Sequence, residues 1–324
     1  MTPRLRQFEP NDLDALAALI TAIDRAGPQP RRVTAEELGE EFDGVHTDPA
    51  RDVIVAEHDG TLVAYGYVML LAGSDRHRCY LWGGVHPTSR HQGLGAQLLA
   101  NLTAMGQRRL DELTDDAPKL LHAYAPADDT VLTALFQRNG WRIVRYFDDL
   151  HRATTPTPVA ACPSGITIVP WDDSRSAELR EVKNTAFADH WGSQPSTEHE
   201  WQQLTHDGAA RLDLSRMALD RHHHVVGLCL AHRHASDDEV LGTRYAWIDK
   251  VATAPTHRGR GIAAALICAT IDTMANDGIE RVALGVDSDN PTGAHRLYAN
   301  LGFTPWARYA TWERPASARQ PVAN

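Results

Sequence analysis

The feature that most constrains how this chain can fold is an internal repeat. The segment PTSRHQGLG at residues 87–95 recurs as PTHRGRGIA at residues 255–263, an offset of 168 residues. A second segment, LFQRNGW at residues 135–141, recurs as LYANLGF at residues 297–303, an offset of 162 residues. Two matching segments in the same order and at nearly equal offset indicate a duplicated domain, not a short solenoid repeat.

The length fits this duplication, because 324 residues are typical of about two domains. A proline-containing stretch separates the copies and predicts an extended, exposed connection. We therefore expect an N-terminal domain over residues 1–153 and a linker over 154–165. A C-terminal domain over 166–314 and a flexible tail over 315–324 complete the expected organisation.

Both copies predict the same order of elements. In each, a helix precedes a hairpin, and a further strand runs into a Gly-rich turn from which a long helix begins. The long helix of the second copy carries an apolar stripe at helical spacing over residues 263–274. A buried strand over 282–286, a short helix from about residue 292 and a last strand over 303–312 follow it.

The composition excludes several classes of partner. The formal net charge of −10 repels phosphate backbones, so we expect no nucleic-acid partner, whereas a cationic amine is attracted. No stretch approaches the roughly 20 apolar residues of a membrane helix, and no apolar run opens the sequence. We expect no membrane association and a cytoplasmic location, with the four cysteines as reduced thiols. The sequence leaves open whether the protein is a monomer or a homodimer.

The run His222-His223-His224 is the one metal-like pattern. Adjacent strand residues point to opposite faces, so at most two of these imidazoles could share a site. No Cys or carboxylate lies at ligand spacing from them. We therefore expect a solvated hairpin tip and no bound metal.

The Gly-rich turn is where the sequence indicates chemistry. A strand that runs into such a turn and then into a helix presents free N–H groups and a positive helix end to an anion. Gly259 and Gly261 permit close approach of a ligand, and Arg258 and Arg260 add charge. The turn has neither the Gly-Lys-Ser/Thr of a P-loop nor a G-x-G-x-x-G fingerprint. Taken alone, the turn is a weak signal, and a tight structural turn from strand to helix is the alternative.

The chain resembles the GNAT superfamily of acetyltransferases in both repeated segments. Residues 253–263, TAPTHRGRGIA, are similar to its motif V-x-P-x-x-R-G-x-G-x-A, with Thr253 in place of the usual Val. Residues 290–303, NPTGAHRLYANLGF, are similar to its element N-x-x-x-A-x-x-L-Y-x-x-x-G-F. The resemblance covers nearly the whole chain and implies two tandem GNAT folds of class α/β (α+β). Each is expected to have a mixed, mostly antiparallel central sheet, flanked by helices, with a splayed strand pair at the CoA site.

The resemblance implies acetyl-CoA as the donor, with its pyrophosphate on the turn and its pantetheine arm along the preceding strand. In the second copy, the residues expected to bind it are Val251, Ala252, Thr253, Arg258, Gly259, Arg260, Gly261, Ile262, Ala263 and Asn290. In the first copy, the corresponding residues are Gly83, Gly84, Val85, Arg90, Gly93 and Gly95.

The resemblance also implies the reaction. A backbone N–H of the strand before the turn polarises the thioester carbonyl, and a neutral acceptor amine attacks it directly. Tyr298 protonates the departing thiolate; the alternative is a tyrosine that packs at the edge of the core. Gly285 stands where some relatives carry a base Glu, so Asp249 is the first candidate base and Asp287 the second. For either Asp, a hydrogen-bonded position at a strand end is the competing interpretation.

The first copy departs from this pattern. Phe136 replaces the tyrosine, and Asp128 stands where Asn290 stands in the second copy. The phenol that would protonate a thiolate is therefore missing, although the first Gly-rich turn could still bind CoA. We expect a non-catalytic N-terminal domain.

The acceptor is expected to be a primary amine of a small molecule. Asp189 and Trp191, in the connection after the first helix of the second copy, and Trp247 are candidate acceptor contacts, because charge and an aromatic face hold a cation. Aminoglycoside, antibiotic and mycothiol-precursor amines fit this expectation, although Trp247 and Asp249 occupy a strand where mycothiol synthases carry a Glu and apolar residues. A protein N-terminus and a CoA-binding pseudoenzyme without turnover are the alternatives.

Overall fold

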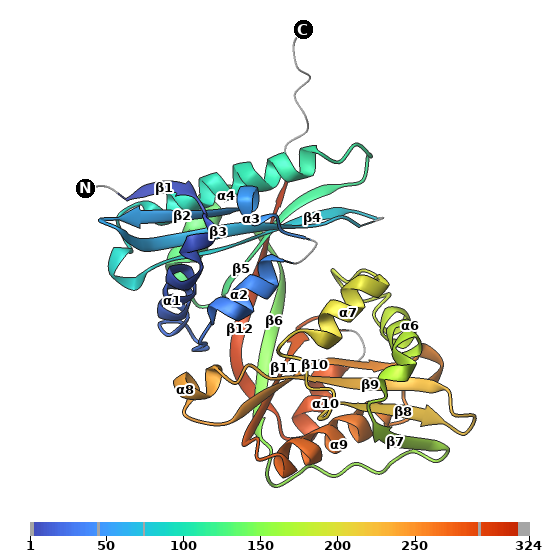
Figure 1. Ribbon diagram of the computed structural model, residues 1–324. Helices are drawn as coiled ribbons and strands as arrows, with labels where there is room; N and C mark the ends of the chain where they lie inside the picture. Colours follow the sequence, from blue (N-terminus) through green and yellow to red (C-terminus); the bar gives the residue numbers. More distant parts are fainter. Residues whose placement is uncertain (1–2, 44–45, 74, 291–292, 317–324) are drawn as a thin grey trace. The chain divides into compact units, whose positions relative to one another are not determined.

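The computed structural model describes residues 3–43, 46–73, 75–290 and 293–316. The chain forms two compact units (Figure 1). Unit 1 contains residues 1–147 and 308–324, and unit 2 contains residues 148–307. The expected tail falls almost entirely on residues 317–324, which lie outside the described residues.

Unit 1 is built on a sheet with strand order β1-β2-β3-β4-β5-β12. Its strands are β1 (Arg4–Gln7), β2 (Val53–His58), β3 (Thr61–Leu71), β4 (His77–Val85), β5 (Lys119–Pro126) and the end of β12 (Thr304–Pro315). Its helices are α1 (Leu13–Asp24), α2 (Ala35–Phe42), α3 (Pro49–Asp52), α4 (Leu94–Asp111) and α5 (Thr130–Arg138). Side chains of α1 and α2 pack on one face of this sheet, and those of α4 pack on the other.

Unit 2 repeats the pattern with strand order β6-β11-β10-β9-β8-β7. Its strands are the end of β6 (Arg142–Ala153), β7 (Ile166–Pro170), β8 (Arg216–Asp220), β9 (Val225–His232), β10 (Tyr245–Thr253) and β11 (Arg281–Asp287). Its helices are α6 (Ser176–Ala186), α7 (Glu198–His206), α8 (Asp237–Leu241), α9 (Ile262–Asn276) and α10 (Ala294–Asn300).

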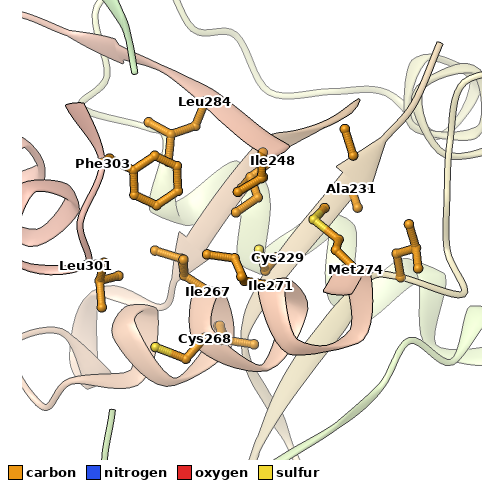
Figure 2. Close-up of a cluster of buried hydrophobic side chains, with 14 of the residues drawn as sticks. Cys229, Ala231, Ile248, Ile267, Cys268, Ile271, Met274, Leu284, Leu301 and Phe303 are labelled. Carbon is orange, nitrogen blue, oxygen red and sulfur yellow. The ribbon is translucent and has the colours of Figure 1, made fainter. Parts of the chain in front are cut away.

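Strand β9 shows how unit 2 buries its sheet. All eight of its residues are buried, because α6 and α7 cover one face and α9 covers the other (Figure 1). Figure 2 shows the α9 side, where Ile267 and Ile271 face Ile248 of β10 and Leu284 of β11. Successive strand residues alternate faces, so Gly285, which follows Leu284, lies on the side opposite α9.

The units divide differently from the boundaries expected from the sequence. The strand expected to complete the second copy ends in unit 1, where residues 309–315 of β12 pair antiparallel with β5. Trp312 is buried there, and Glu313 bonds to His122 and Arg142. Residues 148–153 of β6 belong to unit 2 in turn. Each unit thus contains a strand from the other copy of the repeat, an arrangement that periodicity along the sequence cannot reveal.

The expected linker also starts differently. Thr154 is buried, with its N–H bonded to Glu280 O and its hydroxyl to Ile279 O. The exposed part of the connection lies further on, where the side chain of Val159 is among the most exposed apolar groups of the described chain.

The expected splayed strand pair is present in both units. β4 pairs in parallel with β5 from His77 to Leu81 only, although it continues to Val85. β10 pairs in parallel with β11 from Tyr245 to Trp247 only, although it continues to Thr253. The other strand pairings of each unit that the structure describes are antiparallel. The sheets are therefore mixed and mostly antiparallel, as expected.

Candidate active site

The splay in unit 2 leaves one edge of β10 open. Beyond Trp247, β10 is paired with β9 alone through to Thr253, with a bulge between Ile248 and Lys250. The backbone groups of Val251 to Thr253 that face β11 therefore have no strand partner, which is the arrangement that an extended ligand needs in order to pair as a strand. The hydroxyl of Thr253 is buried and has no hydrogen-bond partner within the described residues.

The turn after β10 is open above its backbone. Gly259 has φ +74° and Gly261 has φ +89°, a left-handed conformation that side chains rarely adopt. A Cβ at Gly259 would have no atom of the described chain within 4 Å. Of the turn's N–H groups, those of His257 and Arg258 bond to carbonyls of the turn, whereas those of Gly259 to Ala263 have no acceptor among the described residues. Free N–H groups at the start of a helix are the arrangement that an anion needs.

The two arginines of this turn, Arg258 and Arg260, fasten it to neighbouring segments by hydrogen bonds to backbone carbonyls. Arg258 Nη2 donates to Ala186 O at the end of α6 (2.7 Å), and Arg260 Nη2 donates to Ser164 O (3.1 Å). Both arginines remain exposed, so their charge also adds to the positive potential of the helix end.

Tyr298 lies on α10 and packs against the α9 core, with its ring edge-on to Phe303 at 5.9 Å. Burial, reinforced by the Cys229 thiol, raises the pKa of the Tyr298 phenol above its ordinary value. The phenol therefore keeps its proton at neutral pH and can donate it.

The two candidate bases occupy different settings. Asp249 lies at the β10 bulge, and its Oδ2 is 2.8 Å from Lys250 Nζ. Burial acts to raise the pKa of Asp249, but the charges of Lys250, His232 and His234 together hold it below its ordinary value. Asp287 is buried at the end of β11 and accepts the N–H of Asp289 (3.0 Å).

Asn290 is half-buried, and its N–H donates to Asp287 O (3.1 Å). The next two residues of its motif, 291 and 292, at which the short helix was expected to begin, lie outside the described residues. The described helix α10 begins at Ala294.

The candidate acceptor contacts lie on the side of the unit 2 sheet opposite α9. The Trp247 ring stacks on Trp306 at 6.2 Å and meets Tyr245 edge-on at 5.9 Å. In the α6–α7 connection, Trp191 is half-buried and Asp189 is exposed.

Sequence reasoning missed Lys183, which fastens that connection. Its ammonium donates to Ser196 Oγ (2.7 Å) and Gln194 O (3.2 Å), although the residue is only 5% exposed. Burial lowers the pKa of Lys183 to about 8. A signal was available, because Lys183 lies on the apolar stripe of α6 with Leu179 and Val182.

The corresponding positions of unit 1 carry different residues. His91, which is exposed, adopts φ +62° at the repeat position of Gly259, so this turn has a side chain where the turn of unit 2 has none. Trp82 of β4 and Tyr124 of β5 stack at 5.3 Å where those strands part. Phe136, at the repeat position of Tyr298, is buried and stacks on Trp312.

The remaining candidate residues of unit 1 serve tight packing and the turn. A Cβ at Gly83 would lie 2.6 Å from Tyr65 O, and one at Gly84 would lie 3.0 Å from Ile23. Arg90 Nε donates to Val85 O (3.2 Å). Gly93 caps α4 with φ +80°, and Gly95 lies in its first turn.

No group of three or more His, Cys, Asp or Glu residues suited to hold a metal ion occurs among the described residues. Within the same residues, no helix is long and apolar enough to cross a membrane.

Solved structures share this architecture over almost the full chain. A GCN5-related N-acetyltransferase from Sphaerobacter thermophilus is 28% identical, with a TM-score of 0.76 over 98% of this chain and 96% of its own. A tandem GNAT protein from the clavulanic acid biosynthesis pathway, at 17% identity and a TM-score of 0.74, covers 98% of this chain and shows the same fold.

Sequence comparisons identify the family. The profile of the acetyltransferase (GNAT) family matches residues 176–303, and that of an acetyltransferase (GNAT) domain matches residues 49–143. A mycothiol acetyltransferase of Stackebrandtia nassauensis is 30% identical over 272 residues, 81% of this chain and 82% of the relative. The mycothiol acetyltransferase of Nocardia farcinica is 28% identical over 94% of this chain and 93% of its own length. The chain therefore belongs to the GNAT family of acetyltransferases and is an N-acetyltransferase with two tandem GNAT domains.

Proposed function

We propose that unit 2 transfers the acetyl group of acetyl-CoA to a primary amine of a small molecule, and that unit 1 has no catalytic role. The observation that carries this proposal is the contrast between the two Gly-rich turns. In unit 2 the space above the turn is open at Gly259, whereas in unit 1 His91 stands at that position.

The donor fits the residues present. GNAT enzymes use acetyl-CoA, whose pyrophosphate matches the free N–H groups of Gly259 to Ala263 in charge and hydrogen bonding. Its extended pantetheine arm matches the unpaired edge of Val251 to Thr253, where the buried Thr253 hydroxyl still needs a partner. Acetyl-CoA supplies a thioester, whose carbonyl carbon accepts a nucleophile.

The chain's own groups then perform three tasks. A backbone N–H on the open edge of β10 hydrogen-bonds the carbonyl oxygen, on which negative charge develops during attack. The splay between β10 and β11 holds the amine next to that carbonyl. Tyr298 gives its proton to the leaving thiolate, which its raised pKa allows because the phenol is protonated at neutral pH.

Asp249 is our first candidate for the group that takes the proton of the acceptor, and Asp287 is the second. The Lys250 charge keeps Asp249 ionised at neutral pH, so Asp249 holds a proton only weakly and passes it on to solvent. Asp287 already accepts the N–H of Asp289, which suits a role in shaping the turn after β11. An unchanged pH–rate profile in Asp249→Asn would remove Asp249 from the mechanism.

For the acceptor, relatives named mycothiol acetyltransferases favour a cysteinyl amine as the first compound to test. The net charge of −10 favours cationic acceptors in general. Trp247 offers an aromatic face for the apolar part of such a molecule, and Trp191 a second one from the α6–α7 connection.

The test incubates the full chain and acetyl-CoA with three probes: S-methylcysteine ethyl ester, the aminoglycoside kanamycin, and a short peptide with a free N-terminus. Mass spectrometry detects the acetylated product. We expect the cysteinyl probe, or failing that kanamycin, to be acetylated faster than the peptide. Slow hydrolysis of tightly bound acetyl-CoA that no amine accelerates would contradict transfer and would favour the CoA-binding pseudoenzyme. Preference for the peptide would favour an N-terminal acetyltransferase.

A further inference from the structure

Gly285 of β11 leaves a space that a side chain from another strand fills. A Cβ built on Gly285 would lie 3.2 Å from Asp149 Oδ1, and no other described atom lies within 4 Å of it. Asp149 belongs to β6, the neighbour of β11 in the unit 2 sheet. A carboxylate therefore stands where a side chain at position 285 would begin, although residue 285 itself carries none.

This carboxylate lies at the splay. Gly285 follows the last parallel pair, Trp247 with Ala283, by two residues. It is exposed and points away from α9, since Leu284 and Val286 on either side of it pack in the α9 core. Asp149 thus lies beside the gap between β10 and β11, on the face that α6 and α7 cover elsewhere in the unit.

The surroundings of Asp149 suit an organic cation. Trp247 and Trp306 stack on this face, and His151, two residues after Asp149 on β6, stacks on Trp306 at 5.2 Å. The Tyr245 hydroxyl is buried and has no hydrogen-bond partner among the described residues. Burial is the main cause of a raised Tyr245 pKa, and the Asp149 charge adds to it.

We propose that Asp149 binds the ammonium group of the acceptor at the splay and positions it, so that the amine attacks once the base proposed above has removed its proton. Apolar parts of the acceptor pack on Trp247 and Trp306, and the Tyr245 hydroxyl, which has no hydrogen-bond partner among the described residues, donates to a polar substituent. The assignment rests on the proposed amine transfer and deepens it, because it names the acceptor as a molecule with a cationic amine beside an apolar surface.

The experiment compares Asp149→Asn with Asp148→Asn. Asp148 is the matched control, because it precedes Asp149 on β6, points to the other face and lies 3.7 Å from His295. With S-methylcysteine ethyl ester as the probe, we expect Asp149→Asn to raise the KM of the amine at least tenfold. The KM of acetyl-CoA should stay within twofold in both variants, and Asp148→Asn should resemble the wild type.

Moving the carboxylate from Asp149 to another strand distinguishes the effect of its charge from the effect of its packing. In the double variant Asp149→Ala with Gly285→Asp, the carboxylate starts from β11 and enters the space that Asp149 has vacated. We expect this variant to recover the KM of the amine to within about threefold of the wild type, whereas Asp149→Ala alone does not. Failure of the relocated carboxylate to improve on Asp149→Ala, with both variants folded by circular dichroism, would contradict the charge role.

Calorimetric titration of the same amine into each protein with CoA present distinguishes this inference from the proposed function. Wild-type binding that weakens tenfold in Asp149→Asn supports the inference even if no acetyl transfer occurs, in which case the proposed function alone fails. Acetyl transfer with equal amine affinity in the wild type and Asp149→Asn overturns the inference alone. Absence of both binding and transfer overturns both.

Discussion

The two units build the same turn and the same splayed strands, but they fill them differently. Unit 1 has His91 in its turn and stacks Trp82 on Tyr124 where β4 and β5 part. Unit 2 has Gly259 over its turn and Gly285 at its splay. The two units therefore share the backbone of a GNAT domain while they differ in the side chains at its turn and splay, because the fold does not require particular side chains there.

The first helices of the two units, α1 and α6, also differ in the side chains that they bury. The buried residues of α1 are all apolar, namely Leu16, Ala17, Leu19 and Ile20. Those of α6 include Lys183, which holds the connection to α7. A buried lysine reduces stability, because burial disfavours its charge. Lys183 therefore lowers the stability of unit 2 while its hydrogen bonds hold the α6–α7 connection in place.

The largest effect should come from exchanging the residues at two equivalent positions, Tyr298 in unit 2 and Phe136 in unit 1. Tyr298→Phe removes the proton donor, and we expect kcat to fall about 10²- to 10⁴-fold while the KM of acetyl-CoA changes little. Phe136→Tyr in unit 1 is the matched control and should leave kcat unchanged. Steady-state kinetics with the best amine probe measures both. Full activity of Tyr298→Phe would break the contrast between the units.

A smaller effect should follow from exchanging the turn residues. Gly259→His copies unit 1 into unit 2, and we expect CoA to bind about 10- to 30-fold more weakly. The imidazole would enter the ligand space, and the left-handed backbone costs a side chain about 1–2 kcal/mol. His91→Gly, the reverse change, should alter transfer by less than twofold. Calorimetric titration with CoA gives both affinities, and equal affinities in Gly259→His and the wild type would mean that the open turn does not hold the donor.

The smallest effect is on stability and concerns Lys183. The pKa of Lys183 is about 8 in the folded protein and near 10.5 when exposed. At a pH between these values, the unfolded chain therefore binds more protons than the folded protein does. The free energy of unfolding of the wild type should therefore rise with pH across this window relative to Lys183→Met, by roughly 1–3 kcal/mol in total. Urea unfolding between pH 7.5 and 10 measures it.

The control for Lys183 is Ile20→Met in α1, which removes no titratable group from the corresponding helix of unit 1. Its free energy of unfolding should follow that of the wild type at a constant offset. If Lys183→Met also keeps a constant offset across this pH range, Lys183 has an ordinary pKa and its burial does not distinguish unit 2.

The sequence predicted those parts of the fold that depend on local patterns. The repeat located both Gly-rich turns, and the helical stripe over residues 263–274 located α9, because such features involve residues close together along the chain. Lys183 could have been found from the same periodicity on α6. The pairing of Asp149 with Gly285 could not, because it joins residues far apart through the neighbouring strands β6 and β11. The acceptor side depends on such contacts, and this is why the sequence leaves it least defined.

The strand exchange between the copies has a consequence for synthesis. Unit 1 takes its last strand from residues 309–315, near the end of the chain, so the N-terminal unit cannot be complete when its own copy of the repeat leaves the ribosome. At typical elongation rates, β5 waits roughly 10 to 40 s for its partner strand. During that interval β5 has an unpaired edge that a neighbouring nascent chain could occupy. For this protein the order of translation is therefore not the order of folding, and a premature stop before residues 309–315 would damage the first unit to be made.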